Sequence, residues 1–96
     1  MKKPDAYAMV EILGAANAVQ VVDQMVKCAT LDMRAWETTC GGHATVILAG
    51  DVSAGKAAVD SIRENPPCPV TGACVISGPS DELFHIVEKQ AAKLNK

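Results

Sequence analysis

The cysteine in the segment Trp36–His43 is the side chain with the clearest chemical potential in this sequence. Cys40 is followed by Gly41 and Gly42, and a run of apolar residues begins at Ala44. Glycine adopts positive φ at little steric cost, so a glycine pair between two strand-like runs predicts a tight hairpin with the cysteine at its tip. If identical subunits meet around an axis, such a tip lines a pore.

The spacing of the cysteines predicts no metal motif within one chain. Cys28, Cys40, Cys68 and Cys74 include no Cys-x-x-Cys pair, and their separations of 12, 28 and 6 residues match no zinc pattern. We expect Cys28 to be a buried structural thiol and Cys74 to be a thiol of the core or of a sheet face. A zinc site within one subunit is therefore not expected.

Two further residues that could do chemistry lack visible partners. Glu11 interrupts an apolar run, and a catalytic acid would need a second group nearby, so we expect a carboxylate at a strand end or at a subunit boundary. His43 follows the glycine pair, and we expect it to face solvent or a neighbouring subunit. The sequence offers no paired base and nucleophile, which argues against an enzyme.

Composition restricts the number of domains, the kinds of partner and the cellular location that the chain can have. A chain of 96 residues forms one domain, and its formal net charge of −2 gives no footprint for nucleic acid or an anionic membrane. The first residues lack the apolar segment of a signal peptide, and no apolar run approaches the length of a transmembrane helix. We expect a cytoplasmic protein, in which stable disulfides are uncommon.

The apolar periodicity, broken by glycine and proline, predicts four strands and three helices. The strands are expected over Ala6–Leu13, Leu31–Thr39, Ala44–Ala49 and Val70–Ser77, and the helices over Ala15–Ala29, Val52–Glu64 and Asp81–Leu94. In the second strand, Leu31, Met33 and Ala35 are expected to alternate with the charged residues Asp32, Arg34 and Glu37. The order β-α-β-β-α-β-α predicts an α+β, ferredoxin-like fold: a four-stranded antiparallel sheet, two helices on one face and an added C-terminal helix.

Four segments carry a resemblance to a known family over nearly the whole chain. They are Met9–Ala18, Asp23–Ala29, Cys40–Val46 and Gly50–Asp60. Their order and spacing resemble the single-domain shell proteins of bacterial microcompartments, the BMC-domain family. The resemblance implies one BMC domain over residues 1–96, with a core over about 5–79 and a C-terminal helix over about 80–94.

The resemblance also implies a function. Members of this family form flat cyclic hexamers that tile, with other shell proteins, into a shell, and a central pore in each hexamer gives selective passage to small metabolites. By residue match, the pore loop here is Thr38, Thr39, Cys40, Gly41 and Gly42. Lys27 matches the lysine at the hexamer edge, and Gly78 stands where the family has an edge arginine between two prolines. The expected protein is thus a non-enzymatic shell subunit.

Two replacements in the loop set its expected chemistry. Thr38 stands where a typical pore loop has lysine, which would remove a ring of six positive charges and weaken the attraction for anions. Cys40 stands where a typical loop has glycine. Six copies of Cys40 would form a ring of soft ligands of the kind that binds iron–sulfur clusters, and some shell proteins of the family are understood to carry a cluster in the pore.

Three classes of function stay open at this point. The first is a passive shell subunit, in which Cys40 is merely a small residue in a narrow loop. The second is a redox-active shell protein, in which an iron–sulfur cluster held by Cys40 relays electrons across the shell, with Cys68 as a possible second ligand. The third is a small enzyme or regulatory binding domain on the same fold, which would be a monomer or dimer with a ligand.

Overall fold

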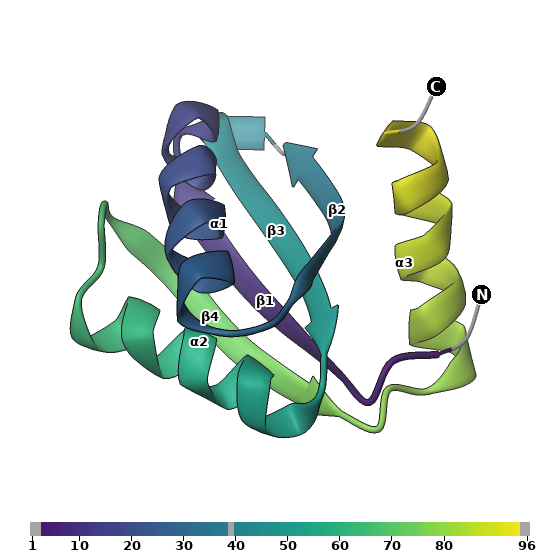
Figure 1. Cartoon of the computed structure of the whole chain (residues 1–96). Coiled ribbons are helices and arrows are strands. Elements are labelled where there is room, and N and C mark those ends of the chain that lie inside the picture. The colour runs from purple at the N-terminus through teal and green to yellow at the C-terminus, as the bar shows by residue number, and fades with distance from the viewer. Residues whose placement is uncertain (1–2, 39, 95–96) are drawn as a thin grey trace.

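Four antiparallel strands form one sheet, with helices on both of its faces (Figure 1). In this computed structural model, residues 3–38 and 40–94 are described, without the side chains of Cys40 and Leu94. The elements are β1 (Ala6–Leu13), α1 (Ala15–Cys28), β2 (Asp32–Thr38), a short 3₁₀ turn (Cys40–Gly42), β3 (His43–Gly50), α2 (Val52–Glu64), β4 (Val70–Ser77) and α3 (Asp81–Leu94). The strand order β2-β3-β1-β4 is the ferredoxin-like arrangement, and the predicted fold class is confirmed.

The main core lies between the sheet and the helices α1 and α2. Alternate residues of the two central strands point to this face, among them Val10 and Ile12 of β1 and Leu48 of β3, all fully buried. Met25 of α1 and Ile62 of α2 cover them, and both are also fully buried. Burial of a side chain of this size contributes about 1.5–3 kcal/mol, so this layer supplies most of the stability.

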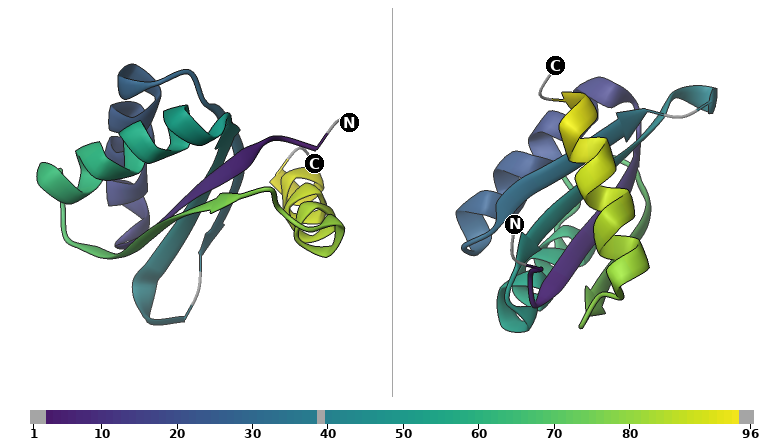
Figure 2. Two further views of the ribbon diagram at one scale, coloured as in Figure 1. Left: turned by 90° about the horizontal axis from the view of Figure 1, so that it is seen from below. Right: turned by 90° about the vertical axis from the view of Figure 1, so that its right-hand side faces the viewer.

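The helix α3 packs alone against the opposite face of the sheet, as both views of Figure 2 show. Val87 of α3 forms a small buried cluster with Tyr7, Ala35 and Ala49 of three different strands. Beside this cluster, Arg34 donates to both carboxylate oxygens of Glu88, at 2.6 and 2.7 Å from Nη2. The ion pair is only about a quarter exposed, and it joins α3 to the edge strand β2.

The predicted alternation in β2 is wrong beyond Met33. Met33 pairs with Leu48 but Ala35 pairs with Ile47, so the extra residue Arg34 forms a β-bulge. A bulge of this kind turns two successive side chains toward one face. Arg34 and Ala35 therefore both reach the α3 face, and Trp36 returns to the α1 face, where it packs against the main core.

Both α2 and α3 begin with a side-chain cap. The carboxylate of Asp51 accepts from the backbone N–H of Ala54 at 2.7 Å, and the Ser80 hydroxyl accepts from the N–H of Leu83 at 3.2 Å. The bond from Ala54 lowers the pKa of Asp51, with a smaller contribution from the Ser53 hydroxyl. Asp51 and Ser80 thus satisfy backbone N–H groups in the first turns of their helices.

We expect Tyr7→Phe to leave the free energy of unfolding unchanged or to raise it by about 1 kcal/mol, because an unpartnered buried hydroxyl is a cost that phenylalanine removes. The Tyr7 hydroxyl is buried and has no hydrogen-bond partner among the described residues. Burial raises the pKa of Tyr7, and the nearby Glu88 carboxylate raises it further. Urea unfolding with an unchanged m-value would measure the effect, and a loss of more than about 1 kcal/mol would show that the hydroxyl has a partner.

Candidate functional site

The loop between β2 and β3 extends past the rest of the sheet as a narrow tip (Figure 2). Gly41 has φ 84° and Gly42 has φ 82°, and both lie in the left-handed region that L side chains disfavour. Two such residues in succession reverse the chain within the short turn Cys40–Gly42. The predicted glycine-dependent hairpin is therefore present.

The base of this tip is tied to the start of α1. The backbone N–H of Gly14 donates to the carbonyl of Gly42 at 2.7 Å, and Gly14 itself has φ 95°. The side-chain amide of Asn17 then donates to the carbonyl of Leu13 at 3.1 Å, which holds the turn from β1 into α1. In the sequence, only a glycine at each of two separate turns marks this link.

The predicted pore-loop residues occupy this tip as far as the structure describes them. Thr38 is the exposed last residue of β2, and Gly41 and Gly42 are exposed. Thr39 and the side chain of Cys40 lie outside the described residues. His43 is half-buried at the first position of β3, and its imidazole lies beside Gly41.

The two predicted edge residues lie at the opposite end of the domain. Ala6 pairs with both Gly50 and Ser77, so the start of β1 and the ends of β3 and β4 meet at the end away from the tip. Gly78 follows β4 there with φ 58°, and its N–H donates to the carbonyl of Asp5 at 2.9 Å. Lys27, in the last turn of α1, is exposed and pairs with Asp23 at 2.8 Å.

The cysteines whose side chains are described do not gather. Cys28 and Cys74 are exposed and Cys68 is half-buried, and all three are free thiols. The expected burial of Cys28 is wrong, since Cys28 is the last residue of α1 and is exposed there. In the described part of the chain, no three His, Cys, Asp or Glu side chains come together as a metal site would require. Burial raises the pKa of the Cys68 thiol, which reduces its thiolate fraction and makes it a poorer metal ligand.

The loop that carries Cys68 nevertheless contacts the first turn of α1, which is joined to the tip. Its sulfur is 3.9 Å from the carbonyl oxygen of Asn17, in the first turn of α1, and that turn is joined to Gly42 through Gly14. The prolines around Cys68 set the course of this loop along the start of α1. Nothing in the sequence pattern marked this contact.

Glu11 has a local partner. The hydroxyl of Thr71 donates to the carboxylate of Glu11 at 2.7 Å and to its backbone carbonyl at 3.2 Å. Thr71 is the extra residue of a bulge between β1 and β4, since Glu11 pairs with Gly72 and Ile12 with Val70. The carboxylate is exposed near the end of β1, as expected, and holds this bulge.

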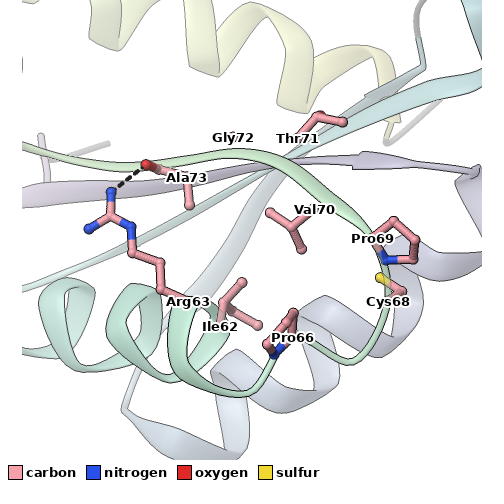
Figure 3. Close-up of a pocket in the computed structure, with 9 residues that line it drawn as sticks. All are labelled: Ile62, Arg63, Pro66, Cys68, Pro69, Val70, Thr71, Gly72 and Ala73. Atoms are coloured by element: carbon pink, nitrogen blue, oxygen red, sulfur yellow. Dashed lines mark hydrogen bonds between the residues drawn. The ribbon is translucent and has the colours of Figure 1, made fainter.

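The hollow beside the proline loop does not have the polar groups of an active site. The hollow in Figure 3 has a volume of about 350 Å³ and lies between the end of α2, the proline loop and the start of β4. Arg63, Cys68 and Thr71 are its polar side chains, and none of them is paired with a histidine or carboxylate within the hollow.

Among the described residues, no helix is long and apolar enough to cross a bilayer.

Comparisons with known proteins bear on the whole domain. The family model described as "BMC domain" matches residues 6–79. The chain is 33% identical over 88 residues to the carboxysome shell protein CcmK2 of Synechococcus elongatus, covering 88% of this chain and 86% of the relative. It is 42% identical over 57 residues to the bacterial microcompartment shell protein PduA of Citrobacter freundii, but that match spans only 61% of the relative.

A solved structure is similar in fold. It is described as a microcompartment protein from Desulfitobacterium hafniense, with a TM-score of 0.75 and 20% sequence identity. The similarity covers 88% of this chain and 47% of the other, so this chain spans about half of that protein.

We expect Gly42→Ala to lower the free energy of unfolding by about 1 kcal/mol, because alanine at a φ of 82° is strained even where space is open. Gly72→Ala is the matched control, since Gly72 also has open space around it but does not have positive φ. Urea unfolding of both variants measures the difference. Equal stabilities for the two variants would contradict the role of left-handed backbone at the tip.

Proposed function

This chain belongs to the BMC-domain family and is a structural shell protein of a bacterial microcompartment, and we propose that it acts there as a cyclic homo-hexamer with a central pore. The tip of residues 38–42 surrounds the pore in this proposal. Other shell proteins are the partners that complete the shell, which lies in the cytoplasm, and small metabolites are the molecules that pass.

The observation that carries the proposal is the polarity of the domain. The glycine-fixed tip extends from one end of the sheet, and Lys27 and Gly78 lie at the other end. A ring of identical subunits needs one end of each subunit at the axis and the other end facing outward. The domain has a narrow end for the axis, held by the bond between Gly14 and Gly42.

The chemistry of the tip supports passage of neutral or weakly charged molecules. The segment Thr38–Gly42 contains no charged residue, so a ring of six tips presents hydroxyl groups, thiols and backbone. Backbone and small polar groups in a pore select by diameter and hydrogen bonding rather than by attraction of one charge sign. The proposed pore is therefore a filter without strong preference for anions.

We infer that the subunit has no catalytic activity of its own. The named relatives are shell proteins, and the hollow beside the proline loop is lined by no histidine or carboxylate. Substrate conversion belongs to whatever the shell encloses. The subunit acts by controlling what crosses.

Native mass spectrometry of the purified protein at micromolar concentration is expected to show six chains in the main assembly. The physical reason is that a small domain with an extended tip gains stability by burial against copies of itself. A monomer or dimer that persists as concentration rises would contradict the hexamer. That outcome would favour a small binding domain on the same fold.

Thr38→Lys is expected to raise the flux of small anions through reconstituted pores by about tenfold at low salt, because six ammonium groups concentrate anions at a narrow opening. Thr38→Ser is the matched control, since it keeps a neutral hydroxyl and should leave the flux unchanged. The increase should shrink at high ionic strength, where the charges are screened. Equal anion flux in the lysine and serine variants would show that residue 38 does not face the pore.

The iron–sulfur alternative at Cys40 stays a prediction, because the side chain of Cys40 lies outside the described residues. Iron and acid-labile sulfide assays on anaerobically purified protein, with Cys40→Ser beside it, separate the two functions. Iron-dependent absorption that vanishes in Cys40→Ser would make the pore redox-active. A colourless, iron-free hexamer in both proteins leaves the passive pore.

A further inference from the structure

The two edge strands of the sheet differ in how they are protected against pairing with other chains. Edge strands expose unpaired N–H and C=O groups, and proteins protect them with charged side chains, prolines or bulges. The edge strand β2 carries Asp32, Arg34 and Glu37 and has a bulge at Arg34. The edge strand β4 carries no charged residue from Val70 to Ser77.

The composition of β4 favours pairing with another strand. Between Val70 and Ser77 it has no proline and no charge, and valine, isoleucine and threonine supply high β-propensity. The bulge at Thr71 disturbs only its first residues. The stretch from Ala73 to Ser77 is regular and pairs with β1 on one side only.

The register identifies the backbone groups that face outward from this edge. The N–H of Gly78 donates to Asp5 on the β1 side, so Gly78 extends the ladder between the two strands. Residues in an antiparallel pair alternate between facing the partner strand and facing away. The N–H and C=O groups of Ala73, Val75 and Ser77 therefore point away from the sheet.

A side chain from α2 donates a hydrogen bond to one of these outward carbonyl groups. Nη2 of Arg63 donates to the carbonyl oxygen of Ala73 at 2.6 Å, as the dashed line in Figure 3 shows. The helix is placed for this contact because it crosses β4 closely: a Cβ added at Gly55 would lie only 3.3 Å from Cγ1 of Val75. The last turn of α2 then directs Ile62 into the core and the exposed Arg63 past the outer edge of the strand.

We propose that Arg63 blocks the free edge of β4 and so prevents β4 of one copy from pairing with β4 of a second copy. An incoming strand would lie about 4.8 Å from β4 and would need the Ala73 carbonyl as an acceptor. The Arg63 guanidinium already donates a charge-assisted hydrogen bond to that carbonyl. In a pair of copies, the Arg63 side chain of the second copy would add another positive charge at the same edge. Two identical edges are self-complementary around a two-fold axis, which makes a second copy the natural occupant.

This inference does not depend on the proposed pore. It concerns the backbone edge of β4, whereas the pore depends on the tip of residues 38–42. A protein that fails to form hexamers could still show the effect of Arg63, and a hexamer could form without it.

Sedimentation velocity on the intact chain tests the proposal with the variant Arg63→Ala. We expect this variant to form assemblies larger than the wild-type one, with an association constant roughly tenfold higher, which corresponds to about 1.4 kcal/mol. Lys56→Ala is the matched control, because Lys56 is exposed two turns earlier on the same flank of α2 and its loss changes the net charge equally. It is expected to behave as wild type. Arg63→Lys keeps a cationic donor and is expected to associate less than Arg63→Ala.

Two further measurements locate the effect. Amide hydrogen exchange in residues 70–77 of Arg63→Ala should slow as protein concentration rises, because new strand pairing protects outward N–H groups. Adding Cys74→Lys, an exposed position on β4, should reverse the association by placing a charge on the edge. The proposal is overturned if Arg63→Ala sediments like wild type, dissociates into smaller species, or associates without protection of residues 70–77.

Discussion

The structure depends on burial of the two central strands from both faces. The helices α1 and α2 cover one face completely, so Val10, Ile12 and Leu48 are fully buried there. The single helix α3 covers only part of the other face, and the residues of β1 on that face differ between the covered and the uncovered part. Tyr7 is buried under α3, whereas Glu11, further along the same face, is exposed and bonded to Thr71. The central strands are thus covered on one face, and the uncovered part of the second face and the tip remain accessible to partners.

The tip is held to the rest of the domain through its backbone. Gly41 and Gly42, both with positive φ, determine its turn, and the bond from Gly14 to Gly42 fastens it to the start of α1. The first turn of α1 packs on the main core through Ala18, which is fully buried. In the proposed hexamer, a loop that defines the pore diameter must keep one shape in every copy, since six deviations would add around the axis. Backbone restraint of this kind meets that need without large side chains in the opening.

Much of the fold was predictable from the sequence, because hydrophobic periodicity and glycine or proline breaks act over short stretches. Gly14, Gly50 and the prolines after Asn65 separate the elements clearly, and the resulting order leads to the ferredoxin-like sheet. The bulge at Arg34 was not predictable, because it depends on α3 supplying Glu88 as a partner from a distant part of the chain. The loop at residues 38–42 was assigned through the family resemblance, and the bond from Gly14 that anchors it connects turns that only the folded sheet brings together. Local pattern therefore gave the elements, and long-range contacts set the details of the candidate site.

A protein built for repeated self-assembly has a particular difficulty with free strand edges. Each copy offers the same edges, so any unintended pairing is available to every other copy at the high local concentration of a shell. In β2 the sequence itself supplies the protection, through charged side chains and a bulge. The strand β4 cannot use the same means along its whole length, because Ala73 and Val75 pack against the main core and cannot be charged. Protection must then come from outside the strand, and Arg63 reaches Ala73 from α2, the element that lies directly over β4. An arginine in that place lets an apolar strand serve the core while its backbone edge stays closed to other copies.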